Sequence, residues 1–427
     1  MPAVTVNESS PYIALRSPNG TDDWAAIQGA INRFDAGVGG RLILGPGTWR
    51  SSQTITLPDD GTHPVTIQGA GMRPTAIRRT TDVILLDCSG EAGGAGTIAT
   101  GHQLRDLTLS ANNTGASAIM RLFYAGQCSF NRVRWNAVQG LGIDGVQVWD
   151  SYWSECRFER LGTDDGTVPA VRFACRTSDT VGAMGYSTDS NNQLDFDSCV
   201  LESGRGGFWF VRNAEGASGS VQNNHTVNFR HAHLEQDTTA GPYIRFYGTN
   251  RSSVSDTMVY VHTLASGASP VNAIEVGSTG LGASSCAFTN VHLHGSNSSD
   301  THRCLIRAEA GAGISLVNVT GDYSGTGKGP TVSLIDWQGT NNFASVKDIR
   351  WLGNTDNRPL FNGSPTSFAS SMWSMPVISG AGRTALADSD FPNAVWDNRV
   401  AMVKNTSDGK IRLGVRDGGT WKHVELT

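Results

Sequence analysis

The amino-acid sequence predicts an all-β solenoid, in which short strands of one chain stack as successive coils. The chain of 427 residues contains 51 glycines and only 17% charged residues, a composition typical of a turn-rich, mostly β protein. Three phrases between Tyr152 and Gln236 also share one pattern, apolar-x-x-apolar-x-apolar-Glu, and they begin at Trp153, Phe196 and Phe229. Because one coil cannot bury its own apolar side, such repeats must stack to form a continuous core.

The same template recurs outside this stretch without the closing glutamate. Further copies begin at Leu104, Phe130, Phe288 and Val346, and a degenerate copy runs from Leu316 to Gly321. The longest gap between copies, from Phe229 to Phe288, predicts a further rung around residues 258–264, whose register the sequence does not fix.

The N-terminal part predicts an extended arm over residues 1–20 and then one short amphipathic helix. Thr21 is a suitable N-cap, the apolar residues Trp24, Ile27 and Ile31 share a face, and glycines from Gly37 end the helix. Short strands separated by Gly and Pro turns follow directly. We therefore expect an N-terminal capping α-helix that closes the open end of the solenoid, with an ordinary surface helix as the alternative.

The C-terminal part predicts a separate small β element. The repeat lapses from about residue 359 into a connector, and residues 401–427 read as short strands joined by turns at Asp408-Gly409 and Gly418-Gly419. The expected domains are therefore an arm (1–20), the solenoid (21–358), and a connector with a C-terminal antiparallel β element (359–427) that caps the solenoid or pairs subunits.

Charge and hydropathy exclude several classes of partner. A net charge of −5, a pI near 6.1 and the lack of any Lys/Arg run exclude a nucleic-acid partner. No window is apolar enough for membrane insertion, and the N-terminal residues lack the basic and apolar regions of a signal peptide. Cys156 and Cys199 occupy apolar positions of the repeat, which predicts buried free thiols.

The three closing glutamates are the leading catalytic candidates. Side chains alternate along a strand, so Glu159, Glu202 and Glu235 are expected to point outward at equivalent strand ends. Stacked strands lie about 4.8 Å apart, so neighbouring carboxylates fall near 5 Å and next-nearest ones near 10 Å. These separations bracket those of retaining and inverting glycosidases, although glutamates are also common at solvent-facing strand ends.

Residues around these rungs add secondary candidates. Asp164 and Asp165 lie in a polar insertion and are further catalytic candidates, with a solvated turn as the alternative. The expected substrate-binding residues are outward cations and histidines, together with aromatics that either stack on sugars or pack in the core: Arg134, Arg157, His233, His292, Trp149, Tyr152 and Trp209. No segment has strong zinc-site spacing, so we expect no metal ion and no cofactor, with a metal site formed by His233, His292 and His294 as the minor alternative.

Three opening motifs carry a family resemblance. The segments TDDWAAIQGAIN, GGRLILGPGTWR and PVTIQGAG closely resemble the start of the pectate-lyase-like superfamily of right-handed parallel β-helix proteins. The resemblance covers roughly residues 21–355, and the chain looks most like a bacteriophage tail spike or polysaccharide depolymerase. It implies a right-handed parallel β-helix, a homotrimer, a cell-surface or capsular polysaccharide as partner, and a place in the virion tail or outside the cell. Such tail spikes usually carry a larger particle-binding region than the twenty or so residues that precede the helix here.

The resemblance leaves three functions open. Glycoside hydrolysis by paired carboxylates is the first expectation. A polysaccharide lyase is the second, because no lysine precedes Lys328 and the base would have to be Arg134, Arg157 or a histidine. The third is a non-catalytic receptor-binding spike that grips glycan with the same face.

Overall fold

The computed structural model describes a large part of the chain and divides it into two compact units. The described residues are 4–6, 12–34, 38–90, 97–111, 117–137, 140–163, 166–175, 191–212, 224–239, 241–264, 271–277, 283, 285–295, 302–309, 312–323, 333–338, 343–351, 361–362, 367–368, 377–380, 384–387, 400–405, 407–408, 410–417 and 420–426. Unit 1 comprises Met1–Asn228 and unit 2 comprises Phe229–Thr427. The domain boundaries expected from the sequence stay a prediction.

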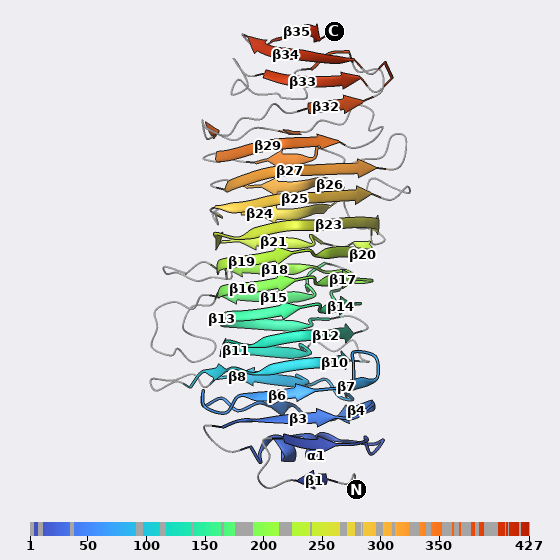
Figure 1. Ribbon diagram of the computed structural model, residues 1–427, viewed down its shortest axis with the longest axis vertical. Helices are drawn as coiled ribbons and strands as arrows, with labels where there is room; N and C mark the ends of the chain where they lie inside the picture. The colour runs from blue at the N-terminus through green and yellow to red at the C-terminus, as the bar shows by residue number, and fades with distance from the viewer. Residues whose placement is uncertain are drawn as a thin grey trace. The chain divides into compact units, whose positions relative to one another are not determined.

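In its described residues, unit 1 contains one short helix, α1 (Trp24–Ile31), and eighteen complete strands (Figure 1). The strands are β1 (Val4–Val6), β2 (Tyr12–Leu15), β3 (Gly40–Leu44), β4 (Gly47–Ser51), β5 (Ile55–Thr56), β6 (Val65–Gln68), β7 (Thr75–Arg79), β8 (Leu86–Ser89), β9 (Ala99–Thr100), β10 (Gln103–Ala111), β11 (Met120–Gly126), β12 (Ser129–Ala137), β13 (Ile143–Ser154), β14 (Arg157–Glu159), β15 (Val171–Cys175), β16 (Asn192–Asp197), β17 (Val200–Glu202) and β18 (Phe208–Arg212). Strand β19 (Asn224–Arg230) contains the unit boundary.

Strand β1 pairs antiparallel with β2. The strands from β2 onward form three parallel ladders, in which each rung pairs with the equivalent strand of the next coil. The first ladder runs β2, β3, β6, β10, β12, β13 and β16. The second runs β4, β7, β10, β12, β14 and β17. The third runs β5, β8, β11, β13, β15 and β18. Unit 1 is therefore a parallel β-helix; its right-handed sense stays a prediction.

One position of the repeat turns the chain between the first and second ladders. The third residue of each template has a left-handed backbone, with φ of 56° at Asp106, 51° at Arg132, 52° at Glu155 and 54° at Ser198. This residue explains why the template reads apolar-x-x-apolar instead of strict alternation, since one extra residue at the bend keeps both flanking apolar side chains inside.

The interior of unit 1 is an aromatic stack. Phe130, Trp153 and Phe196 occupy the same template position on successive rungs, and their rings stack at centroid distances of 4.9 Å and 4.6 Å. Trp135 and Phe158 stack beside them at 4.8 Å. Because these spacings match the distance between hydrogen-bonded strands, each ring packs on the next without distorting the ladder.

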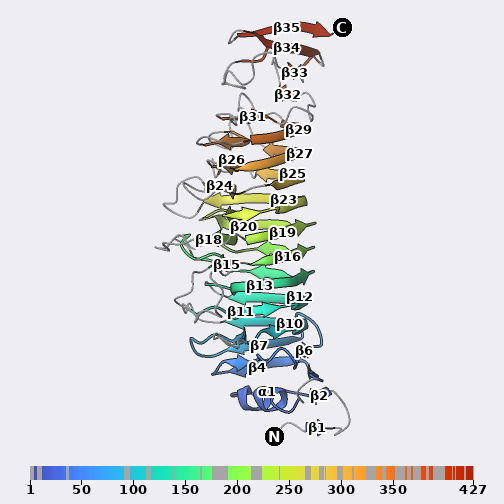
Figure 2. The same ribbon diagram turned by 90° about the vertical axis from the view of Figure 1, so that its left-hand side faces the viewer.

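Helix α1 packs against β2, β3, β4 and β5 of unit 1 (Figure 2). Ile27, Ala30 and Ile31 form its buried face, and the Gln28 side chain bonds to both backbone polar groups of Thr56. The predicted N-cap Thr21 is wrong, because the buried Asp23 holds that position and its carboxylate accepts from the backbone N–H groups of Asn19 and Arg50. The helix also ends earlier than predicted, at Ile31. Its capping role stays a prediction.

Unit 2 contains parallel rungs of its own and a separate C-terminal sheet. Its strands are β20 (His233–Thr239), β21 (Ile244–Tyr247), β22 (Thr249–Asn250), β23 (Ser253–Leu264), β24 (Val271–Val276), β25 (Cys286–Gly295), β26 (His302–Ala308), β27 (Gly313–Tyr323), β28 (Ile335–Trp337), β29 (Phe343–Trp351), β30 (Phe361–Asn362), β31 (Ser367–Phe368), β32 (Val377–Gly380), β33 (Val400–Asn405), β34 (Ile411–Asp417) and β35 (Thr420–Leu426). Strands β20, β23, β25, β27 and β29 pair in parallel. The predicted hidden rung is confirmed on β23, but the register with β25 places its template at residues 254–259, a few residues before the predicted 258–264.

The C-terminal strands form the four-stranded sheet of β32 to β35. Strand β34 pairs antiparallel with both β33 and β35, as the hairpin turns of the sequence predict, and β32 adds a parallel edge.

The predicted buried free thiols at Cys156 and Cys199 are confirmed. Within the described ranges, no helix combines the length and apolar character needed to cross a bilayer.

Candidate functional site

The second ladder of unit 1 presents two columns of outward side chains. One column reads Thr48, Ala76, Thr108, Arg134, Arg157 and Val200 in register, and the other reads Arg50, Arg78, Ser110, Asn136, Glu159 and Glu202. Arg134 on β12 and Arg157 on β14 therefore stand beside the glutamates that close the repeated phrase on β14 and β17.

A groove runs along these columns. A cavity of about 460 Å³ is lined by Met72, Arg73, Arg134, Arg157, Glu159, Glu202 and Ser203. A second cavity of about 250 Å³ shares Met72, Arg73 and Arg134 with the first and reaches back to Thr48, Arg78 and Arg160. We call the two adjoining cavities the arginine groove. Among the described residues that line it, five arginines face two glutamates, a balance of +3 in a chain whose net charge is −5.

Glu159 is held in place by the arginines around it. Its Oε2 accepts from Arg134 through Nε at 2.8 Å and through a second guanidinium nitrogen, and its Oε1 accepts from Arg157 Nε at 3.0 Å. The side chain is only 15% exposed. With both oxygens engaged by guanidinium groups, Glu159 fixes the orientation of Arg134 and Arg157 on the groove floor.

Glu202 is the more accessible of the two glutamates. Its side chain is 38% exposed, and one oxygen accepts a hydrogen bond from the guanidinium of Arg157. Arg157 thus bridges Glu159 and Glu202, which are register partners on β14 and β17. Register partners on hydrogen-bonded strands place their side chains about 5 Å apart, so the two carboxylates can contact the same sugar unit.

The loop between β6 and β7 forms one wall of the groove. Gly71, whose φ is 141°, donates its backbone N–H to the Asp106 carbonyl at 2.8 Å, and Thr108 donates its hydroxyl to the Met72 carbonyl. These bonds to β10 position Met72 and Arg73 against the groove. Sequence reasoning missed both residues, although the Gly-Ala-Gly turn before them signals a backbone that lies close to the next rung.

The other predicted site residues that the structure describes are not among those that line the groove. In unit 2, Glu235 is paired with His233 at 2.9 Å, and His292 lies on β25. In unit 1, Tyr152 donates its hydroxyl to Asp197 at 3.0 Å, and Trp149 packs against a buried cluster around Phe123. Trp209 lies on β18, in register with Arg172 on the third ladder.

The structure therefore brings together Arg134, Arg157, Glu159 and Glu202. None of the three aromatic candidates is among the described residues that line the groove. The loop candidates Asp164 and Asp165 lie outside the described residues.

Comparisons with known proteins agree with the fold. No protein-family model and no curated protein matches the chain. Similar solved structures include the surface adhesin PfbA of Streptococcus pneumoniae, at 10% identity over 84% of this chain and 97% of that chain, with a TM-score of 0.55. They also include the tailspike protein of Acinetobacter baumannii phage AM24, at 11% identity over 76% and 52% of the two chains, with a TM-score of 0.49. A third is the A-module of the mannuronan C-5 epimerase AlgE6 of Azotobacter vinelandii, at 14% identity over 84% and 97%, with a TM-score of 0.48.

At 10% identity the similarity to PfbA concerns the fold alone. The other two structures, whose TM-scores are below 0.5, carry no further argument about the fold. The similarity to PfbA agrees with the parallel ladders observed here and with the resemblance in fold predicted from the opening motifs. The chain is an all-β protein with a parallel β-helix fold.

Proposed function

We propose that the protein binds an acidic cell-surface or capsular polysaccharide in the arginine groove and cleaves it there. The observation that carries the proposal is the alignment of five arginines with two adjacent-rung glutamates along one groove. Guanidinium groups bind carboxylate, sulfate and phosphate through paired N–H donors, and a groove parallel to the ladder can follow a polymer over several rungs. Tail-spike-like placement in a virion and a homotrimeric assembly remain predictions from the family resemblance.

Glycoside hydrolysis by Glu202 and Glu159 is the proposed chemistry. An anionic group of the sugar can replace Glu202 as the partner of Arg157, which leaves Glu202 free to act on the glycosidic oxygen. Glu159, one rung away, remains fixed by Arg134 and supplies the second carboxylate of the pair. The expected separation of about 5 Å corresponds to the retaining class of glycosidase.

A polysaccharide lyase is the second candidate, and the arginines favour it. In β-elimination the proton beside a uronate carboxylate is removed and negative charge develops next to that carboxylate. Arg73, Arg134 and Arg157 line one cavity, so they can neutralise this charge. Both chemistries need the same acidic sugar in the same groove.

One assay separates the candidates. The full chain is incubated with acidic and neutral capsular polysaccharides while reducing ends and the absorbance of unsaturated uronates are followed. Reducing ends alone identify hydrolysis, and reducing ends with the new absorbance identify elimination. Binding without either signal would reject cleavage and leave a binding spike. Equal binding of neutral and acidic polymers would contradict the proposed role of the arginines.

Arg157→Met tests the groove directly. Loss of a charge-assisted hydrogen bond is worth roughly 1.5–3 kcal/mol, so affinity for the acidic polymer should fall roughly 10- to 100-fold. Isothermal titration calorimetry measures the change. The matched control is Arg172→Met, because Arg172 is similarly exposed and pairs with its register neighbour Asp144 on the third ladder, outside the groove. An equal loss of affinity in both variants would show that the overall positive charge, and not the arginine groove, determines binding of the acidic polymer.

A further inference from the structure

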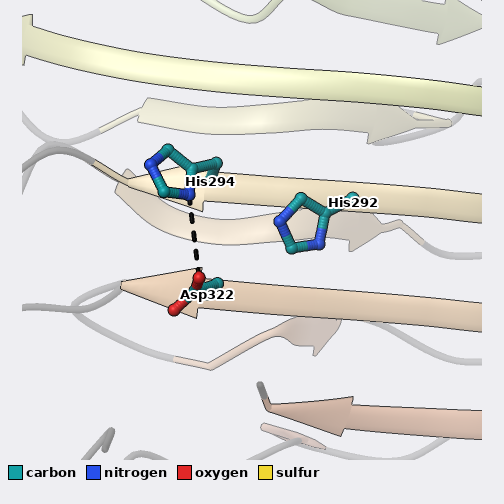
Figure 3. A group of neighbouring side chains, drawn as sticks. All are labelled: His292, His294 and Asp322. Atoms are coloured by element: carbon teal, nitrogen blue, oxygen red, sulfur yellow. Dashed lines mark ion pairs between the residues drawn. The ribbon is translucent and has the colours of Figure 1, made fainter. Parts of the chain in front are cut away.

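Unit 2 contains a cluster of two histidines and one aspartate, contributed by two neighbouring strands (Figure 3). His292 and His294 lie on β25, and Asp322 lies on β27 as the register partner of His294. Because residues two apart on a strand point to the same side, both imidazoles face the direction in which Asp322 projects. One potential ligand atom from each residue lies within 4.8 Å of the other two.

The distances suit a shared metal ion better than direct bonds between the side chains. His294 Nδ1 lies 3.8 Å from Asp322 Oδ2, which is too long for a hydrogen bond. Zinc binds nitrogen and oxygen ligands at roughly 2.0–2.2 Å, so two ligands of one tetrahedral ion lie about 3.4 Å apart. Small side-chain rotations therefore bring the three groups onto one ion without moving the strands.

Neighbouring residues orient both imidazoles. His292 Nδ1 lies 2.8 Å from the hydroxyl of the buried Thr320, so a proton on Nδ1 leaves Nε2 as the free ligand atom. This is the usual arrangement at metal-binding histidines, whose second nitrogen is held by a hydrogen bond. The ring of Tyr260 stacks on His294 at 4.8 Å, which fixes that imidazole from the side of β23.

The exposure of the cluster also suits a ligand role. His294 is 29% exposed and Asp322 is 36% exposed, so an ion can enter from solvent. The sequence pattern did not favour a metal site because Asp322 lies 28 residues from His294 and only the β25–β27 register brings them together.

We propose that His292, His294 and Asp322 form a binding site for a divalent transition-metal ion such as Zn²⁺. Two imidazoles and one carboxylate are a ligand set that zinc and related ions accept, and they leave at least one coordination position for water or for an oxygen of a ligand. The site lies entirely within unit 2 and is independent of the chemistry proposed for the arginine groove.

Titration of the metal-free full chain with Zn²⁺ alone, followed by isothermal titration calorimetry, tests the site. The wild-type protein should bind one equivalent saturably. Asp322→Asn and His294→Ala should each weaken this binding at least about tenfold, and Thr320→Val should weaken it about 10- to 100-fold through the loss of the His292 hydrogen bond. Circular dichroism of each metal-free variant establishes whether it is folded.

His233→Ala is the matched control. His233 is also a partly exposed histidine beside a carboxylate in unit 2, but it belongs to β20 and lies outside the cluster. Its removal should leave the binding isotherm unchanged. Absence of saturable binding to the wild-type chain would overturn the proposal. So would wild-type affinity in both Asp322→Asn and Thr320→Val, or an equal loss in His233→Ala.

Discussion

Glu202→Gln is expected to lower the turnover of an acidic polysaccharide by roughly 10²- to 10⁴-fold, the range that a positioned acid or base contributes. The substitution keeps the size of the side chain and a carbonyl oxygen that can still accept from Arg157, so the groove should keep its shape. It removes the group that gives or takes a proton. The effect should therefore appear in kcat, with KM changed only slightly.

Two companion variants make this result interpretable. Asp144→Asn neutralises a carboxylate of unit 1 that pairs with Arg172 outside the groove, and it should retain wild-type turnover. Glu235→Gln tests the sequence-based assignment of Glu235 separately, because that residue belongs to unit 2. Wild-type turnover in Glu202→Gln would remove Glu202 from the catalytic machinery, whatever the groove binds.

Trp153→Ala should destabilise unit 1 more than any surface change. The indole is fully buried, stacks between Phe130 and Phe196, and meets Phe173 edge-on at 5.5 Å. Truncation of a buried aromatic to alanine costs roughly 3–5 kcal/mol, because it leaves a cavity that the rigid rungs cannot close. For a unit of this size we expect the melting midpoint to fall by roughly 6–20 °C. Differential scanning calorimetry measures it.

Two other aromatic substitutions provide the comparison. Trp153→Phe keeps a ring in the stack and should lose less than half as much stability. Trp149→Ala removes an indole of the same size that is only partly buried beside the Phe123 cluster, so its effect should also be smaller. A melting midpoint for Trp153→Ala within about 2 °C of wild type would contradict the view that the stack stabilises the unit.

Much of the fold could be predicted because each rung repeats the same physical requirement. The template marks where apolar side chains point inward, and Phe130, Trp153 and Phe196 are buried as it requires. The rung on β23 was located only approximately because Thr257 occupies its middle apolar position. That threonine is buried, and its hydroxyl is satisfied by the Ser255 carbonyl at 2.9 Å, so it replaces an apolar residue without leaving an unpaired group.

Less of the site could be predicted, because partners from different rungs are far apart in the sequence. The shared column of Glu159 and Glu202 follows from the repeat, and the register of β14 and β17 confirms it. The bridge through Arg157 and the contribution of Arg73 depend on side-chain direction and on a loop, which a strand template does not describe. The aromatic candidates were chosen by proximity in sequence, and they belong to other ladders.

The third residue of each template, at the bend between the first and second ladders, can vary without affecting the packed interior. In unit 1 it holds Asp106, Arg132, Glu155 and Ser198, residues with little in common except a left-handed backbone and a side chain directed away from the core. Selection can therefore exchange these side chains rung by rung while the interior stays constant. Asp106 and Arg132 already form an ion pair across two rungs, at 2.7 Å. The side chains at the bends can therefore be replaced without a change in the packed interior of the unit.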